Sequence, residues 1–200
     1  ALGAQRACEL YCALVEQTLA TASELAAGAE VGIEVRLAGA PDAAAAREWL
    51  GDTVAIREQG DGDLGARLER ATRDALAEGA PAVLAIGADC PELSTAHLTA
   101  ALSALRENDL VLGPAIDGGY YLIGLRHPAP TLFSGIAWST ATVLAQTLAA
   151  AQRAALTCHL LERLGDVDEP DDLPRWAATP VAQAAGRDRV SVIIPALNEF

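Results

Sequence analysis

Aspartates at three separate places in this sequence could together hold a divalent cation. They are Asp89, Asp117 and Asp168, and each stands where a strand is expected to end. Hard cations take oxygen ligands, and magnesium is held by one or two carboxylates while water and a substrate phosphate complete its octahedron. Two strand-end aspartates at the right separation would therefore be enough for a cation bound to phosphate.

Asp89 is the most informative of these positions. It lies in the run A-V-L-A-I-G-A-D-C-P-E-L of residues 82–93, whose apolar part predicts a buried central strand. Pro91 cannot continue that strand because it lacks a backbone N–H. Asp89 is thus placed at the carboxyl end of a strand, where ligands bind in open α/β sheets. The alternative is a cap for the helix beginning near Ser94, although Ser94 or Thr95 could provide that cap.

The other two aspartates have a structural alternative as well. Asp117 begins D-G-G-Y-Y, in which Gly118 and Gly119 remove side chains where a sugar or a substrate backbone could approach. The same residues could form only a tight turn with Asp117 at its start. Asp168 lies in the acidic stretch D-V-D-E-P-D-D-L of residues 166–173, which could equally be a solvated loop before a short helix.

A glycine-rich loop and a polar–aromatic turn are further candidates. The loop Q-G-D-G-D-L-G-A-R-L of residues 59–68 leads into a helix, so its backbone N–H groups could receive a base or a phosphate. It is neither a Walker A loop nor a dinucleotide fingerprint. The turn W-S-T of residues 138–140 stands near a helix start, where it could contact a ligand or place Trp138 in the core.

Apolar periodicity predicts helices alternating with strands along the chain. We expect helices over 4–27, 42–50, 66–78, 95–106, 139–153 and 173–178, and strands over 31–38, 53–57, 82–88, 109–115, 120–125, 156–161 and 190–194. The pair 109–115 and 120–125 is expected to form a hairpin or a sharp reversal. This order predicts an α/β fold, with a mainly parallel sheet and helices on both of its faces.

Composition narrows the possible partners and the compartment. The net charge of −13 argues against nucleic acid or an anionic membrane as a partner. No apolar run reaches the roughly eighteen residues of a membrane span, and charged residues interrupt the first helix, which is unlike a signal peptide. The four cysteines follow no zinc or disulfide pattern, so we expect reduced thiols in a cytoplasmic protein.

Five ordered segments resemble a known bacterial family. They are Q-G-D-G-D-L-G-A-R-L (59–68), I-G-A-D-C-P-E-L (86–93), V-L-G-P-A-I-D-G-G-Y-Y-L-I-G-L (111–125), W-S-T (138–140) and D-V-D-E-P-D-D-L (166–173). They resemble the domain of unknown function 2064, within the nucleotide-diphospho-sugar transferase (glycosyltransferase-A) superfamily. The resemblance spans roughly residues 2–178, and characterised relatives include nucleotidyltransferases of molybdenum cofactor and coenzyme F420 synthesis.

The resemblance implies a three-layer α/β/α fold of the glycosyltransferase-A type and a transferase acting on a nucleoside triphosphate or a nucleotide-sugar. It implies Mg²⁺ or Mn²⁺ held by Asp89, with Asp117 and Asp168 assisting, and makes Asp89 and Asp117 the candidate catalytic residues. The nucleotide would lie near the loop residues. These candidate binding residues are Asp63, Leu64, Gly65, Gly118, Gly119, Trp138, Ser139 and Thr140.

The two ends of the sequence depart from this family. Its members usually begin with a strand and a basic loop, Pro-Gly-x-x-Lys-Thr-Arg-Leu, whereas this sequence begins at Ala1. Its last residues, V-S-V-I-I-P-A-L-N-E, resemble the first strand of family 2 glycosyltransferases. We therefore expect a transferase domain over 1–181, a linker over 182–189, and the start of a fused family 2 glycosyltransferase over 190–200. We also predict that residues 190–194 take the sheet position of the family's usual first strand.

The sequence is compatible with two different functions. The first is a metal-dependent nucleotidyl- or glycosyltransferase, which the three aspartates favour. The second is a non-catalytic module fused to a family 2 glycosyltransferase, which the absence of the basic phosphate loop from this sequence favours.

Overall fold

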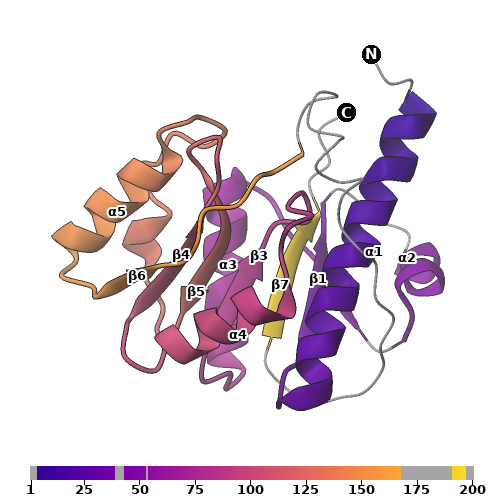
Figure 1. Cartoon of the computed structure of the whole chain (residues 1–200), viewed down its shortest axis with the longest axis horizontal. Coiled ribbons are helices and arrows are strands. Elements are labelled where there is room, and N and C mark those ends of the chain that lie inside the picture. Colours follow the sequence, from indigo (N-terminus) through magenta and orange to yellow (C-terminus); the bar gives the residue numbers. More distant parts are fainter. Residues whose placement is uncertain (1–3, 39–42, 53, 168–190, 197–200) are drawn as a thin grey trace.

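The structure is a computed structural model, and it describes residues 4–38, 43–52, 54–167 and 191–196 (Figure 1). Helices and strands alternate along most of this length. In chain order they are α1 (Ala4–Gly28), β1 (Ile33–Leu37), α2 (Ala43–Leu50), β2 (Ala55–Glu58), α3 (Leu64–Ala77), β3 (Val83–Ile86), α4 (Thr95–Ala104), β4 (Leu110–Pro114), β5 (Tyr120–Leu125), the 3₁₀ turn η1 (Pro130–Leu132), α5 (Val143–Arg153), β6 (Cys158–Leu160) and β7 (Ser191–Ala196).

One seven-stranded sheet forms the middle layer, in the order β2-β1-β7-β3-β5-β4-β6. β1 pairs in parallel with β2 and β7, β7 with β3, and β4 with β6. β5 is antiparallel to both of its neighbours, β3 and β4. All strands except β5 therefore run in one direction, and their carboxyl ends share one edge at the top of Figure 1. We call it the carboxyl edge.

Helices cover both faces of this sheet, as the alternation predicted. α1 and α4 lie in front of the strands and α3 and α5 lie behind them (Figure 1). β3 shows why, because its side chains alternate between the two faces. Leu84 and Ile86 pack in the core on the α1 and α4 side, while Val83 and Ala85 pack with α3 and α5. The expected three-layer α/β/α architecture is confirmed.

Two helix starts differ from the sequence prediction. The helix expected from 66 begins at Leu64, because the Asp63 carboxylate accepts the Ala66 N–H at 2.8 Å and caps it. The helix expected from 139 begins only at Val143. Ser139 has a φ of 58°, a left-handed conformation that no helix start can use. The helix therefore starts four residues later than expected, with Thr142 as its N-cap.

The strand expected over 190–194 is β7, and it lies between β1 and β3. Its backbone register with β1 runs from Ile33↔Val192 to Leu37↔Ala196. This is the central position that we predicted for it.

The domain division and the identity of a fused second enzyme stay predictions. The linker 182–189 and the helix expected over 173–178 lie outside the described residues.

A buried ion-pair network ties the sheet to α3. Glu34 and Arg36 of β1 are only 4% and 2% exposed. Arg36 Nε donates to Glu34 Oε1 at 2.6 Å, and its Nη1 reaches Asp74 of α3 at 3.2 Å. Arg57 of β2 contacts the second oxygen of Glu34 at 2.9 Å. Because a buried charge is costly without a partner, this network fixes three elements relative to one another.

Candidate functional site

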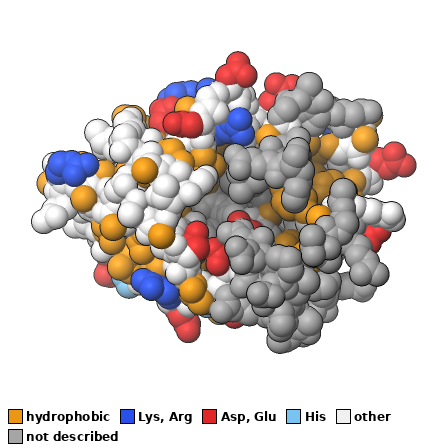
Figure 2. Space-filling model, turned by 90° about the horizontal axis from the view of Figure 1, so that it is seen from above, with side chains coloured by type: hydrophobic (Ala, Val, Ile, Leu, Met, Phe, Trp, Pro, Cys, Tyr) orange, Lys and Arg blue, Asp and Glu red, His pale blue; other side chains and the backbone are white. Residues whose placement is uncertain are grey.

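The predicted site residues that the structure describes all lie at the carboxyl edge. Asp63 follows β2, Asp89 follows β3 and Asp117 follows β4, and these three strands run in the same direction. The turn containing Trp138 precedes α5, which returns toward the start of β6. Figure 2 views this edge from above and shows acidic side chains near the middle of the molecule. Loops at this edge are where open α/β sheets bind ligands.

Asp89 lies in a tight turn directly beyond β3. A Cβ built on Gly87 would stand 2.5 Å from Asp89 Oδ1, so the carboxylate folds back over the end of the strand. Only a glycine leaves room for it there. The Gly87 N–H donates to the Tyr121 carbonyl at 2.9 Å, which ties this turn to β5. The backbone of the Asp89 turn is therefore tied to the central strands of the sheet.

The segment 164–167 runs beside this turn. The Val167 N–H donates to the Asp89 carbonyl at 2.9 Å. The Gly165 N–H donates to the Glu92 carboxylate at 3.0 Å. The acidic stretch that begins at Asp166 is thus brought next to Asp89, although Asp168 itself lies outside the described residues.

The same segment also contacts the end of β4. The Leu164 N–H donates to the Pro114 carbonyl at 3.1 Å, and the Ile116 N–H donates back to the Leu164 carbonyl at 3.0 Å. Segment 164–167 therefore connects the loop of Asp89 on one side to the loop of Asp117 on the other.

Asp117 is exposed and shapes its own turn. Its Oδ1 accepts the Gly119 N–H at 2.8 Å, and its other oxygen has no hydrogen bond to any described residue. Gly118 has a φ of +95°, and a Cβ there would collide with the Ala141 carbonyl. The Gly118 carbonyl accepts the Leu144 N–H at 2.9 Å. The tight turn is confirmed, and the role of Asp117 as a cation ligand stays a prediction.

The start of α3 packs against the turn 138–140. A Cβ on Gly65 would stand 2.5 Å from the Phe133 carbonyl oxygen and 2.8 Å from Trp138 Cε2. Tyr120 meets Trp138 edge to face, with ring centroids 6.3 Å apart. Leu64 packs in the same cluster. Residues predicted from two distant motifs are thus in direct contact, and Trp138 belongs at least partly to the core.

Ser139 and Thr140 are exposed, and the Thr140 side chain makes hydrogen bonds within its own turn. The Thr140 hydroxyl donates to the Ala137 carbonyl at 2.7 Å and lies 2.8 Å from the Thr142 hydroxyl. No hydrogen bond links either residue to another predicted site residue within the described part of the chain. The structure therefore gives the Thr140 side chain a turn-forming role.

Arg67 and Arg70 of α3 are functional candidates that sequence reasoning missed. Arg70 donates to the carbonyls of Gln59 and Asp61, and Arg67 donates to the carbonyl of Gly62. Their three-residue spacing on one helix face, directly after a glycine-rich loop, was the signal that could have identified them.

Burial keeps two nearby groups protonated. Burial, and then the carboxylates of Asp89 and Glu92, raise the pKa of the Cys90 thiol to about 12. Burial also raises the pKa of Tyr121, whose hydroxyl donates to the Glu162 carbonyl at 3.0 Å. Neither group is suited to act as a nucleophile or a base near neutral pH.

The donor atoms at the carboxyl edge fit a hard cation in their chemistry. Asp89, seated on the Gly87 cradle, and the exposed Asp117 both offer carboxylate oxygens. Within the described residues, however, no three acidic, histidine or cysteine side chains come close enough to hold a metal together. A third ligand at Asp168 stays a prediction.

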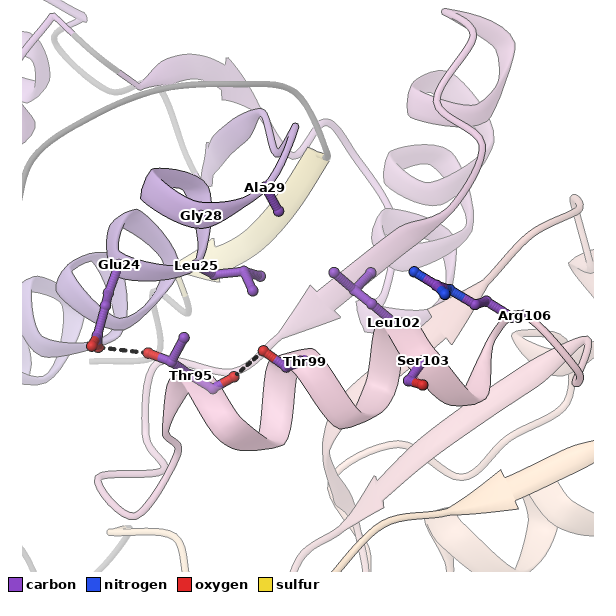
Figure 3. Close-up of a pocket in the computed structure, with 9 residues that line it drawn as sticks. All are labelled: Glu24, Leu25, Gly28, Ala29, Thr95, Thr99, Leu102, Ser103 and Arg106. Atoms are coloured by element: carbon purple, nitrogen blue, oxygen red, sulfur yellow. Dashed lines mark hydrogen bonds between the residues drawn. The ribbon is translucent and has the colours of Figure 1, made fainter.

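A pocket of about 350 Å³ lies elsewhere, between the end of α1 and α4 (Figure 3). Thr95 Oγ1 donates to Glu24 Oε2 at 2.6 Å across it, and Thr99 Oγ1 donates to the Thr95 carbonyl at 2.8 Å. None of the predicted site residues lines this pocket. The pocket is therefore separate from the predicted site residues at the carboxyl edge.

No helix in the described part of the chain is both long and apolar enough to cross a membrane.

Comparison with known proteins agrees with this architecture. The family model of the uncharacterized bacterial proteins called domain of unknown function 2064 matches residues 20–140. No curated protein matches the chain. A crystal structure of a candidate nucleotide-diphospho-sugar transferase from Desulfovibrio desulfuricans G20 superposes with a TM-score of 0.77 at 30% identity, covering 84% of this chain and 72% of that one. The fold is thus that of a nucleotide-diphospho-sugar transferase, and the chain belongs to the family of domain of unknown function 2064.

Proposed function

We propose that this chain is a metal-dependent transferase whose donor substrate is a nucleoside triphosphate or a nucleotide-sugar. The observation that carries the proposal is the bridge made by segment 164–167. It links the Asp89 loop to the Asp117 loop through backbone hydrogen bonds of 2.9–3.1 Å. Two carboxylates at one sheet edge, in a fold shared with a transferase relative, support a metal–diphosphate site.

In this proposal Asp89 and Asp117 hold the cation, with Asp168 as the third ligand. Bound Mg²⁺ or Mn²⁺ would neutralise charge on the phosphate oxygens of the donor. The fixed turn at Gly87 orients the Asp89 carboxylate, so little reorganisation accompanies binding. The missing side chain at Gly118 lets Ala141 pack closely on the turn that presents Asp117, so this glycine shapes the proposed site and does not itself open substrate space.

The glycine-rich loop and the start of α3 form the nucleotide side of the proposed site. Asp63, Leu64 and Gly65 lie there, and Trp138 closes the space behind Gly65. Ser139 and Thr140 shape the turn that carries Trp138. The net charge of −13 is compatible with an anionic substrate when a bound cation inverts the local field. We place this function in the cytoplasm.

A thermal-shift screen tests the proposal. Nucleoside triphosphates and nucleotide-sugars are added to the chain with and without Mg²⁺ or Mn²⁺. A nucleotide that binds only the native state raises Tm, by more the further its concentration exceeds its Kd, and we expect this rise only when the metal is present. If no nucleotide gives a metal-dependent rise, the transferase proposal is wrong and the non-catalytic alternative takes its place.

A further inference from the structure

We propose that Arg70 is a positioning residue for nucleotide recognition, which holds the loop of residues 59–62 so that its backbone N–H groups face the nucleobase. This inference rests on the proposed function, because it concerns the nucleotide side of that site. Nothing in the sequence motifs assigned Arg70 a role.

The first step is the contact between Arg70 and the loop carbonyls. Its Nη1 donates to the Gln59 carbonyl at 2.6 Å and its Nη2 donates to the Asp61 carbonyl at 2.8 Å. Arg67, one turn earlier, donates through Nε to the Gly62 carbonyl at 2.9 Å. These are charge-assisted bonds, and one planar guanidinium fixes two carbonyls at once. A loop of polar and small residues thereby gains a defined shape.

The second step is the glycine between those two carbonyls. Gly60 has a φ of +74°, which favours glycine. A Cβ on Gly60 would stand 2.6 Å from Arg70 Nη1 and 3.0 Å from its Cζ. The Arg70 guanidinium thus fills the space beside residue 60, and any side chain at that position would displace it.

The third step is the orientation of the remaining polar groups. With three carbonyls turned toward α3, the N–H groups of Gly60, Asp61 and Gly62 donate to no described residue. All three residues are exposed at the carboxyl edge. Backbone N–H donors suit the acceptor atoms on the edge of a nucleobase, such as ring nitrogens and carbonyl oxygens. The loop is therefore suited to reading the base, while the carboxylates beyond β3 and β4 belong to the phosphate side.

Arg73 provides a matched control on the same helix. It pairs with Glu69 and Asp74 on the exposed surface and contacts no loop carbonyl. Arg73→Ala removes the same side chain and the same charge as Arg70→Ala, one turn further along. Gly60→Ala is the complementary variant, because it leaves Arg70 in the chain but pushes its guanidinium out of place.

The test measures affinity by calorimetry for the four common nucleoside triphosphates and for inorganic tripolyphosphate, each with Mn²⁺. We expect Arg70→Ala and Gly60→Ala to weaken the preferred nucleotide by about tenfold, because the loop loses its preorganisation. Tripolyphosphate has no base, so its affinity should stay within about twofold, as should all affinities of Arg73→Ala. Arg70→Lys, which can reach only one carbonyl, should fall between.

Three results would overturn the inference. Unchanged nucleotide affinity in both Arg70→Ala and Gly60→Ala would remove Arg70 from any positioning role. An equal loss for nucleotide and tripolyphosphate would show general damage rather than base positioning. If the unsubstituted chain binds tripolyphosphate but discriminates no nucleotide from it, the base-reading loop is wrong while the phosphate side of the proposed function stands. Failure to bind either probe would instead overturn the proposed function itself.

Discussion

The backbone N–H of Val167 donates to the carbonyl of Asp89 across 78 positions of sequence, at a distance of 2.9 Å. This bond joins the segment after β6 to the turn after β3. Glu92 adds a second bond, from the Gly165 N–H to its carboxylate at 3.0 Å. The acidic stretch beginning at Asp166 is therefore held beside Asp89 by the backbone and one side chain.

Glu92 should control how firmly this segment is held. In Glu92→Ala the Gly165 N–H loses its acceptor, so we expect its amide hydrogen to exchange about tenfold faster, the loss of a bond of about 1.4 kcal/mol. Glu92→Gln keeps an acceptor oxygen and should exchange nearly as slowly as the unsubstituted chain. Residue-resolved hydrogen exchange measures this. Equal exchange in the alanine and glutamine variants would show that the Glu92 side chain does not hold the segment.

Gly65→Ala should destabilise the protein although alanine favours helices. The new Cβ would stand 2.5 Å from the Phe133 carbonyl oxygen and meet the Trp138 ring. We expect the free energy of unfolding to fall by about 1–3 kcal/mol, as in overpacked cores. Gly28→Ala is the control, because nothing lies within 4 Å of a Cβ at the end of α1. Urea denaturation compares the two, and a Gly65→Ala variant as stable as Gly28→Ala would refute the packing.

Glu34→Ala should be far more costly than Glu78→Ala. Removing Glu34 leaves the guanidinium of Arg36, whose side chain is only 3% exposed, without its 2.6 Å partner. Asp74 still pairs with Arg36 at 3.2 Å, so we expect a cost near the lower end of the about 3–5 kcal/mol for breaking a buried ion pair. Glu78 pairs with Arg57 at the surface, where its side chain is 55% exposed, so its loss should cost about 0–1 kcal/mol. Denaturant titration distinguishes them. Similar losses in both variants would mean that the network is solvated.

The Cys90 thiol should make stability depend on alkaline pH. Its pKa is raised from the ordinary 9.0 to about 12, so between these values the unfolded chain loses a proton that the native chain keeps. The free energy of unfolding is therefore unaffected by this thiol below about pH 9 and falls as the pH rises toward 12. Cys90→Ala should show a smaller fall between about pH 9 and about pH 10.5. Exposed Cys8 serves as the control, since Cys8→Ala should keep the full fall.

Much of the fold could be predicted from local sequence because its elements are short and strongly patterned. The apolar run before Asp89 is β3, and the reversal around Gly118 joins β4 to antiparallel β5. Pro91 and the paired glycines mark chain breaks by their backbone chemistry alone. These signals act over a few residues, so one sequence is enough to read them.

The remaining features depend on contacts between distant residues. Periodicity cannot show that Trp138 fills the space beside Gly65, or that Glu34 and Arg36 are buried under α3. Periodicity also cannot show that Ser139 is left-handed, or that Ala141 packs against Gly118 just before α5 begins. The role of Arg70 depended on where the 59–62 loop lies relative to its helix. Tertiary packing decides each of these positions.

Metal-dependent nucleotide binding by Asp89 is the central claim, and Asp89→Asn tests it most directly. The substitution keeps size and polarity but removes the charge that a hard cation requires. Asp52→Asn is the control, because Asp52 is exposed and precedes β2, at the opposite end of the sheet. The measurement is calorimetric binding of Mn²⁺ and of the best nucleotide from the screen. We expect Mn²⁺-dependent nucleotide binding to disappear in Asp89→Asn and to persist in Asp52→Asn; unchanged binding in Asp89→Asn would contradict the account.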